Sequence, residues 1–205
     1  MALAVLIPAA GAARRMRGRD KLLEEVAGEP VLRRLACAAL GAGLGPVAVA
    51  LRRHDPARRA ALDGLPLSIL TVAEADEGMA ASLRVGADWV AGLAETGQGA
   101  QRIAGLFICP ADMPGIEAGD FAAMAAAFDP EGPPLRAASA DGQAGHPVLF
   151  PARLLPLLGS LRGDEGARSI LALHKPRLLS LADDRALIDL DTPEAWAAWR
   201  AGSKG

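Results

Sequence analysis

The sequence predicts an α/β domain with a mostly parallel sheet, and three observations lead to this prediction. Short apolar runs of strand length alternate with longer stretches of helical periodicity. The short runs are almost entirely apolar, as in strands that are buried on both faces of a parallel sheet. The chain has 205 residues, 51% of them hydrophobic, so it can bury the core of a single Rossmann-like domain over residues 1–205.

The regular alternation occupies the first two thirds of the chain. Proline at the start and glycine after the end delimit the first long helix, at residues 30–42. Helical periodicity also predicts helices at 56–62, 79–93 and 120–128. Strands are expected at 3–8, 46–51, 67–72 and 103–109.

The pattern becomes less regular after residue 130. Residues 132–175 are expected to elaborate the sheet, and the final helix is expected at 193–201. In open α/β sheets, ligands bind beyond the carboxyl ends of the strands, so the residues that follow each strand are candidate site residues. The other elements expected here are strands at 135–139, 147–150, 177–182 and 186–190 and helices at 152–158 and 167–173.

Composition and charge exclude several classes of function. The formal net charge is −2 and aromatic residues make up 3%, with no tyrosine, which argues against a nucleic-acid-binding protein. The two cysteines, Cys37 and Cys109, have no companion histidine, which argues against a zinc site and fits a reducing cytoplasm. No apolar run is long enough for a membrane span or a signal peptide, so we expect a cytoplasmic protein with no membrane partner.

The loop after the first strand has the composition of a polyphosphate-binding loop. Small residues at 9–13 let backbone N–H groups approach a ligand closely. A solvated basic loop is the alternative, and neither a P-loop nor a Gly-x-Gly-x-x-Gly motif occurs in the loop. Positive charge is concentrated directly after these small residues, although the chain as a whole is slightly acidic. The basic residues are Arg14, Arg15, Arg17, Arg19 and Lys21.

Two aspartates follow segments that are predicted as strands. Asp112 comes after the strand at 103–109, and Asp191 comes at the end of the last one, each within an Asp-x-Pro sequence. Two such carboxylates can converge on Mg²⁺, which prefers one or two carboxylates together with substrate phosphates. Alternatively, Asp112 begins a turn, and Asp191 or Thr192 is the N-cap of the final helix.

Three further segments place glycine and polar residues where elements begin. Gly78 and Ser82 open the helix after the third strand, and His146 begins a strand within Gly-His-Pro. Residues 163–168 open another helix, whose N-terminus and arginine would attract an anion. The structural alternatives are an ordinary helix start, a structural histidine and, for Asp164, a helix cap.

Taken in order, these motifs resemble those of the MobA-like nucleotidyltransferases, and within that class the molybdenum cofactor cytidylyltransferases. The resemblance covers most of the chain and rests on six motifs at plausible spacing. They are Ala-Ala-Gly-x-x-x-Arg-Met at 9–16 with Lys-Leu-Leu at 21–23, Gly-Met-x-x-Ser-Leu at 78–83, Asp-Met-Pro at 112–114, Gly-His-Pro at 145–147, Gly-Asp-x-Gly-Ala-Arg at 163–168 and Asp-x-Asp-Thr-Pro at 189–193.

The first loop combines features of two branches of this class. Ala10 stands where the guanylyltransferases typically have glycine, and Lys-Leu-Leu at 21–23 also favours the cytidylyltransferases. The Gly-x-Asp-Lys spacing at 18–21 resembles the guanylyltransferase branch instead. The opening at 7–11 is similar to that of the enzyme that transfers CMP to methylerythritol phosphate, but that enzyme's Asp-x-Ala-Arg-Pro motif is absent.

The resemblance implies that the terminal phosphate of molybdopterin attacks the α-phosphorus of CTP and that pyrophosphate leaves. It implies Mg²⁺ as cofactor, a molybdopterin-type acceptor, and a recipient molybdoenzyme or its chaperone as a further partner. The alternatives are a GTP-using enzyme, a sugar-phosphate nucleotidyltransferase, a nucleotide-sensing module and a non-catalytic cofactor-binding chaperone.

The resemblance also implies a role for individual residues. The catalytic residues would be Arg15, Lys21 and Asp112, with Asp112 and Asp191 holding the metal. The acceptor would be bound by His146, Asp164 and Arg168. The nucleotide would be bound by Ala9, Ala10, Gly11, Ala12, Ala13, Arg14, Gly78 and Ser82.

Overall fold

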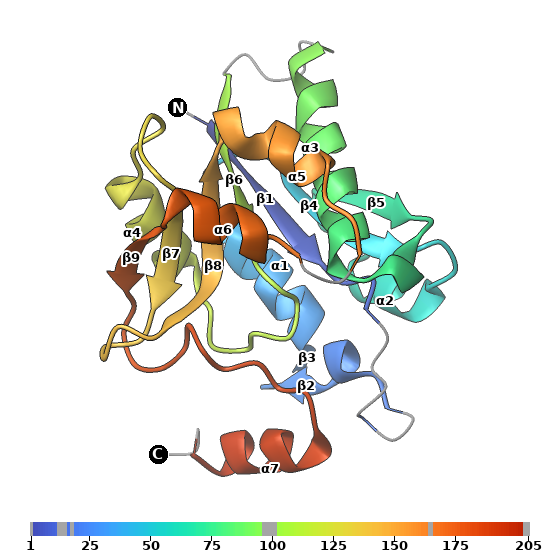
Figure 1. Ribbon diagram of the computed structural model, residues 1–205. Coiled ribbons are helices and arrows are strands. Elements are labelled where there is room, and N and C mark those ends of the chain that lie inside the picture. Colours follow the sequence, from blue (N-terminus) through green and yellow to red (C-terminus); the bar gives the residue numbers. More distant parts are fainter. Residues whose placement is uncertain (1, 12–15, 17–18, 96–101, 164–165, 203–205) are drawn as a thin grey trace.

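The computed structural model describes residues 2–11, 16, 19–95, 102–163 and 166–202. One seven-stranded sheet forms the centre of the molecule (Figure 1). Its strands are β1 (Ala2–Pro8), β4 (Val47–Arg52), β5 (Ser68–Val72), β6 (Ile103–Ile108), β7 (Leu135–Ala138), β8 (Ala144–Pro151) and β9 (Arg177–Ser180). They lie in the order β5-β4-β1-β6-β8-β7-β9. Only β8 runs antiparallel to its neighbours, so the predicted α/β fold with a mostly parallel sheet is confirmed.

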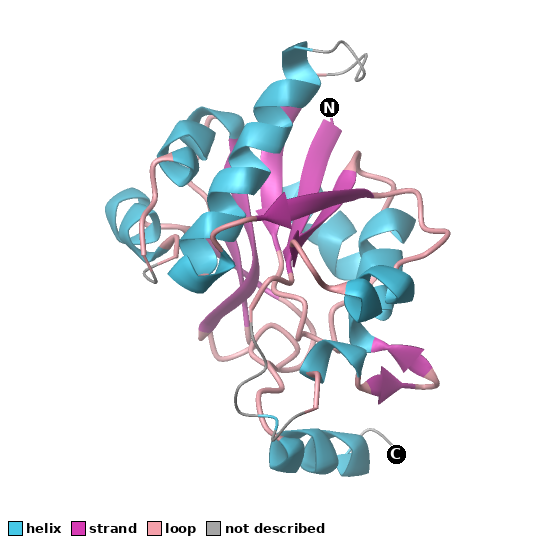
Figure 2. Ribbon diagram, turned by 90° about the vertical axis from the view of Figure 1, so that its right-hand side faces the viewer, coloured by secondary structure: helices cyan, strands magenta, loops and turns pink. Residues whose placement is uncertain are grey.

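Helices cover both faces of the sheet, as Figure 2 shows. No helix in the described part of the chain is long and apolar enough to cross a membrane. The helices are α1 (Val31–Gly41), α2 (Pro56–Ala61), α3 (Met79–Glu95), α4 (Ala118–Ala127), α5 (Leu155–Gly159), α6 (Arg168–His174) and α7 (Pro193–Gly202). Elements of two or three residues, too short for a periodic signal, are the 3₁₀ turns η2 (Lys21–Leu23), η3 (Ala75–Glu77) and η4 (Ala152–Leu154) and the hairpin β2 (Glu25–Val26) and β3 (Glu29–Pro30).

The core is divided by the sheet, as the alternation of side chains along β1 illustrates. Val5 and Ile7 pack on one face with residues of α1 and α4, including Phe121. Ala4 and Leu6 point to the other face, against α3 and α5. All seven residues of β1 are buried, which explains why this strand reads as a continuous apolar run rather than an alternating one.

The segment at 132–175 belongs to the same sheet. It supplies β7 and β8, and then α5, which packs against α3 on one face. Because β8 is antiparallel to β6, the residues that begin β8 lie at the edge where the parallel strands end. His146 is thereby brought to the same edge as the loops that follow β1 and β6.

One predicted strand, at 186–190, is wrong: these residues form a turn and an extended loop. They form single hydrogen bonds to other segments instead of a strand ladder: Ala186 O accepts from the amide of His146, in β8, at 2.8 Å, and the amide of Leu190 donates to Asp112 O at 3.3 Å. Gly145 makes the first contact possible, because a Cβ at that position would lie 2.0 Å from Ala186 O. Asp191 therefore follows a loop rather than a strand end.

Candidate active site

The loop that follows β1 presents two backbone amides to a ligand. Arg58, from α2, donates to the carbonyls of Ala9 at 2.6 Å and Gly11 at 2.9 Å, and Arg52 donates to that of Ala10 at 2.7 Å. The amides of Ala10 and Gly11 have no acceptor among the described residues. Two adjacent amides without acceptors, beside small side chains, are suited to phosphate oxygens.

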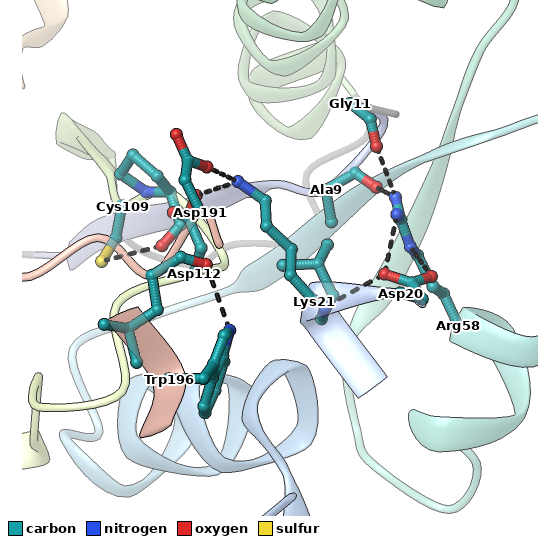
Figure 3. Close-up of polar contacts among 12 residues, drawn as sticks. Ala9, Gly11, Asp20, Lys21, Arg58, Cys109, Asp112, Asp191 and Trp196 are labelled. Carbon is teal, nitrogen blue, oxygen red and sulfur yellow. Dashed lines mark hydrogen bonds and ion pairs between the residues drawn. The ribbon is translucent and has the colours of Figure 1, made fainter. Parts of the chain in front are cut away.

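Lys21 joins this loop to the two predicted metal ligands. It lies in η2, whose first turn is capped by Asp20, because Asp20 Oδ1 accepts from the amide of Leu22 at 3.0 Å. The ammonium of Lys21 donates to Asp112 Oδ2 at 2.5 Å and to Asp191 Oδ1 (Figure 3). Burial alone would lower the pKa of Lys21, but the charges and hydrogen bonds of the two carboxylates outweigh it and raise the pKa above its usual value.

The two carboxylates come from distant parts of the sequence, Asp112 from its middle and Asp191 from near its C-terminus. Asp112 follows β6, and the amide of Ala111 donates to Pro8 O at 3.3 Å, which ties this turn to the end of β1. Asp191 is held by its neighbour Leu190, whose carbonyl accepts from Nε1 of the buried Trp196 at 3.2 Å. The terminal helix α7 therefore serves to anchor Asp191.

The residue that caps the N-terminus of α7 is Thr192 rather than Asp191. Thr192 Oγ1 accepts from the amide of Ala195 at 3.2 Å, as an N-cap does. The carboxylate of Asp191 is thus available to bond Lys21 across the sheet edge. The sequence alone left both residues open for this role.

The donor set fits a hard divalent cation. The carboxylate of Asp112 has a second oxygen, Oδ1, which is buried and has no hydrogen-bond partner within the described residues. Asp189 lies nearby, since its burial and the charges of Asp112 and Asp191 raise the pKa of its carboxyl. No three His, Cys, Asp or Glu side chains of the described chain converge on one point, so phosphates and water would have to supply the remaining ligands.

A cavity of about 150 Å³ lies between the loop and these charged groups. Residues 9–11, Lys21 and Asp112 border it, and Gly78 and Ser82 close it at the start of α3. Gly78 has φ +90°, a conformation that favours glycine, and it brings the chain around from η3 into α3. The described residues of the predicted nucleotide site therefore meet at one cavity.

A second cavity, of about 590 Å³, adjoins the first. Met79 and Pro110 border both cavities, so a ligand in one can reach the other. The walls are largely apolar, with Val148 and Phe150 from β8. This shape suits a larger, flat ligand body next to a compact polar site.

Three basic side chains line the second cavity. They are His146, Arg168 at the start of α6, and Arg136 from β7. Burial and the charge of Arg136 lower the pKa of His146 to about 4, so His146 is neutral at pH 7. Burial and the charge of Arg168 lower the pKa of Arg136, and neither arginine is paired with a carboxylate of the described residues. The cavity therefore carries positive charge that suits an anionic or carbonyl-rich ligand.

Some predicted site residues lie outside the described part of the chain. Two belong to predicted reaction and acceptor roles, Arg15 and Asp164, and the others to the nucleotide loop, Ala12, Ala13 and Arg14. Met16, between two undescribed stretches, is buried against Val31, Leu190 and Trp196. This packing connects the first loop to the segment that carries Asp191.

Sequence reasoning missed three residues with clear structural roles here. Arg136 is the lone charged residue in the predicted strand at 135–139, and this isolated charge was a signal that could have identified it as a candidate site residue. Asp189 shares a motif with Asp191, which was a usable signal. Arg58 carries no comparable signal, because it stands in a polar helix with a second arginine beside it.

Comparison with known proteins assigns the chain to a family. Residues 5–184 match the MobA-like NTP transferase domain. The chain therefore belongs to the MobA-like NTP transferases, as the motifs predicted. No match to a curated protein was found.

The fold is shared with several solved structures, one of which is described as a nucleotidyl transferase. Rv0371c of Mycobacterium tuberculosis is 25% identical, with a TM-score of 0.76 over 97% of this chain and 98% of that one. The same protein has also been solved in complex with manganese. A nucleotidyl transferase from Methanothermobacter is 20% identical, with a TM-score of 0.76 over 98% and 97% of the two chains. CMP:2-keto-3-deoxy-manno-octonic acid synthetase, solved with CTP, is 16% identical, with a TM-score of 0.68 over 99% and 98%.

Proposed function

We propose that this protein, as a single MobA-like domain over residues 1–205, transfers CMP from CTP to the terminal phosphate of molybdopterin and releases pyrophosphate. One observation carries the proposal. A lysine and two carboxylates, Lys21, Asp112 and Asp191, meet beside a loop in which two amides have no acceptor among the described residues, and a larger basic cavity adjoins this site. A family of NTP transferases supplies the general reaction, and the two adjoining cavities supply room for two substrates.

The reaction requires positioning more than proton transfer. An acceptor oxygen forms a bond to the α-phosphorus of CTP while the bond to the bridging oxygen of the leaving pyrophosphate breaks. A phosphate monoester has a second pKa of about 6, so the nucleophile is already mostly dianionic at pH 7. No general base is needed, and the chain's part is to align the two phosphates and stabilise the charge on the leaving group.

The roles follow from where the groups lie. The amides of Ala10 and Gly11 bind the leaving phosphates, and Lys21 stabilises their developing charge. Asp112 and Asp191 would hold a divalent cation, Mg²⁺ in our proposal, which neutralises phosphate charge when bound. The manganese complex of Rv0371c supports a cation of this type for the same fold.

We assign the second cavity to the acceptor. Its apolar walls would accommodate the pterin, and Arg136 and Arg168 would pair with its polar and anionic edges. A neutral His146 can donate and accept hydrogen bonds, as a pterin edge demands. Attack in line, from the side opposite the leaving pyrophosphate, requires that the acceptor extend away from the first loop, which this cavity permits.

One observation favours CTP over GTP, and a second removes an argument for GTP. The Cβ of the buried Ala10 borders the small cavity, where it would obstruct a purine more than a pyrimidine. The Gly-x-Asp-Lys spacing at 18–21, which resembles the GTP-using branch, has a different explanation in this chain. Asp20 is engaged by Arg58 and by the amide of Leu22, so it has a structural role that is independent of the base.

A non-catalytic chaperone of the cofactor would need the large cavity alone. The charged cluster at Lys21 and the adjoining loop would then have no purpose, so the enzyme is the better explanation. The GTP-using and sugar-phosphate alternatives would place other ligands in the same two cavities. A recipient molybdoenzyme or its chaperone would receive the product.

Pyrophosphate release tests the proposal. The protein is incubated with each of the four nucleoside triphosphates and Mg²⁺, with and without molybdopterin. We expect release with CTP that requires molybdopterin, and loss of release in Asp112→Asn. The control is Asp63→Asn, an exposed carboxylate that borders neither cavity. Release with GTP alone would assign the GTP-using branch, and molybdopterin-independent release would exclude this acceptor.

A further inference from the structure

We propose that Arg58 is a positioning residue for the nucleotide phosphates. Its guanidinium holds the loop at 9–11 and the turn that carries Lys21 in one arrangement. The inference rests on the proposed function only in taking a nucleoside triphosphate as the ligand of this loop. Arg58 lies in α2, outside every motif that resembles the family.

The guanidinium of Arg58 is a buried junction between two segments. Its side chain is 5% exposed. Nη1 donates to the carbonyls of Ala9 and Gly11, at 2.6 and 2.9 Å. Nε and Nη2 donate to the two carboxylate oxygens of Asp20, at 2.7 and 3.0 Å, as Figure 3 shows. One planar fork therefore joins the end of β1 to the start of η2.

Asp20 connects the guanidinium of Arg58 to the turn that carries Lys21. Its Oδ1 also accepts from the amide of Leu22 at 3.0 Å, which sets the first turn of η2. Lys21 lies between these two residues, and its ammonium reaches Asp112. The backbone from which Lys21 extends is thus held by the Arg58–Asp20 pair.

The same guanidinium orients the amides of the loop. The carbonyls of Ala9 and Gly11 are bound by Arg58, and that of Ala10 is bound by Arg52. These bonds restrict rotation of the peptide groups and leave the amides of Ala10 and Gly11 directed away from protein acceptors of the described chain. A loop that is ordered before phosphate arrives binds it without the entropic cost of ordering.

A lysine at position 58 cannot make the hydrogen bonds that the planar guanidinium of Arg58 makes. An ammonium has three donors on a flexible stem and no planar pair that matches a carboxylate. Arg58→Lys keeps the positive charge and the stem but loses the bidentate bond to Asp20 together with one or both carbonyl bonds. The variant therefore tests geometry separately from charge.

The alternative is that Arg58 contributes to stability alone, as a buried ion pair that anchors α2. Asp55 caps this helix through the amide of Arg58 at 3.1 Å, and that bond does not depend on the side chain of residue 58. The helix start is therefore retained in Arg58→Lys. Affinity for nucleotide, rather than melting temperature, distinguishes the two roles.

The experiment compares wild type with Arg58→Lys, Asp20→Asn and the double variant. Arg59→Lys is the matched control, because Arg59 is the next residue of the same helix and is exposed. CTP binding is measured by calorimetric titration, and the KM values for CTP and acceptor by pyrophosphate release. Circular dichroism gives the melting temperature of each variant.

We expect Arg58→Lys and Asp20→Asn to weaken CTP binding by about 10- to 100-fold, the scale of a misplaced binding group. The KM for the acceptor should stay at the wild-type value. The double variant should be no weaker than the worse single variant, because the bidentate contact with Arg58 that Asp20→Asn removes is already lost in Arg58→Lys. Arg59→Lys should bind CTP as wild type does.

Wild-type affinity for CTP in Arg58→Lys, with or without a lower melting temperature, would overturn the proposal. If Arg58→Lys does not fold, CTP binding by Asp20→Asn tests the proposal instead. The side chain of residue 20 is 27% exposed, and asparagine keeps an oxygen that can accept from the amide of Leu22, so this variant should fold. Unchanged affinity there would also overturn it. A wild type that binds CTP but transfers nothing to molybdopterin refutes the acceptor alone, since the binding comparison still tests Arg58.

Discussion

Replacement of Lys21 by methionine should affect metal binding and turnover in opposite directions. The ammonium lies 2.5 Å from Asp112 Oδ2 and also bonds Asp191, so it occupies the carboxylates that would hold a divalent cation. A cation that binds the same two oxygens, Asp112 Oδ2 and Asp191 Oδ1, must first displace the ammonium. Methionine keeps an unbranched apolar stem of similar length and removes the charge.

The size of the effect on metal binding follows from these contacts. A hydrogen bond to a charged group contributes about 1.5–3 kcal/mol. The side chains of Asp112 and Asp191 are 14% and 26% exposed, so water and the incoming cation recover part of this energy. We estimate a net cost of about 1–2 kcal/mol for displacing Lys21, which corresponds to about 5–30-fold in affinity. Nucleotide-free Lys21→Met should bind Mn²⁺ more tightly by that factor.

Turnover should respond in the opposite sense. Without Lys21, the leaving pyrophosphate loses one cationic donor, and kcat should fall by about 10²–10³-fold. Calorimetric titration with Mn²⁺ measures the first effect, and pyrophosphate release at saturating CTP measures the second. Asp191→Asn is the control for the metal site and should bind Mn²⁺ more weakly than wild type. Equal or weaker Mn²⁺ binding in Lys21→Met would refute the shared site, and an unchanged kcat would refute the role of the lysine.

Further predictions concern the carboxylate, the histidine, the acceptor cavity and the base. Asp112→Asn should reduce pyrophosphate release to background, because the carboxylate that would hold the cation is lost, while the melting temperature stays within a few degrees of wild type, because asparagine has nearly the same shape. Burial and a neighbouring arginine lower the pKa of His146 to about 4, so the unfolded state takes up a proton between pH 6.5 and 4 that the folded state does not. Stability is therefore lost as the pH falls through this window, and urea unfolding should show a loss from pH 7 to pH 5 that is about 2 kcal/mol larger in wild type than in His146→Gln. Arg168→Gln should raise the KM for the acceptor and leave the KM for CTP unchanged, because Arg168 borders only the larger cavity. Ala10→Gly should narrow the preference for CTP over GTP, measured as the ratio of kcat/KM values.

Each of these predictions has a contrary result. Wild-type rates in Asp112→Asn at limiting Mg²⁺ would make Asp112 a turn residue only. Equal pH dependence in wild type and His146→Gln would mean that His146 is protonated in the folded protein as readily as in the unfolded one. Parallel increases of both KM values in Arg168→Gln would place Arg168 in a structural role, and a larger preference for CTP in Ala10→Gly would contradict the steric explanation.

The success of the strand predictions has a local cause. A strand buried on both faces, such as β1, needs an apolar residue at every position, and such a run is visible without any knowledge of its neighbours. The same rule failed at 186–190. These residues are apolar because Ala186 and Leu190 are buried, yet their backbone joins one residue of β8 and one residue of the turn after β6 by single hydrogen bonds and forms no strand ladder among the described residues.

The candidate site was predictable in so far as topology alone brings groups together. Parallel strands end at one edge of the sheet, so the loop at 9–11 and Asp112 had to be neighbours once β1 and β6 were paired. Asp191 also lies at this edge of the sheet, as predicted, but not because a strand ends there. It is carried there by a loop and by the packing of Trp196, which no local pattern indicates.

The sequence by itself determined the order of the elements, the family and the chemical types at the site, because burial periodicity and short motifs are local properties of the chain. Only the tertiary structure decided which charged groups act together. Arg58 reads as a solvated helix residue, like Arg59, until folding places Asp20 and Gly11 around it. A guanidinium has the same sequence signature whether water or a carbonyl surrounds it, so its partners are set by contacts between distant segments rather than by its neighbours in the chain.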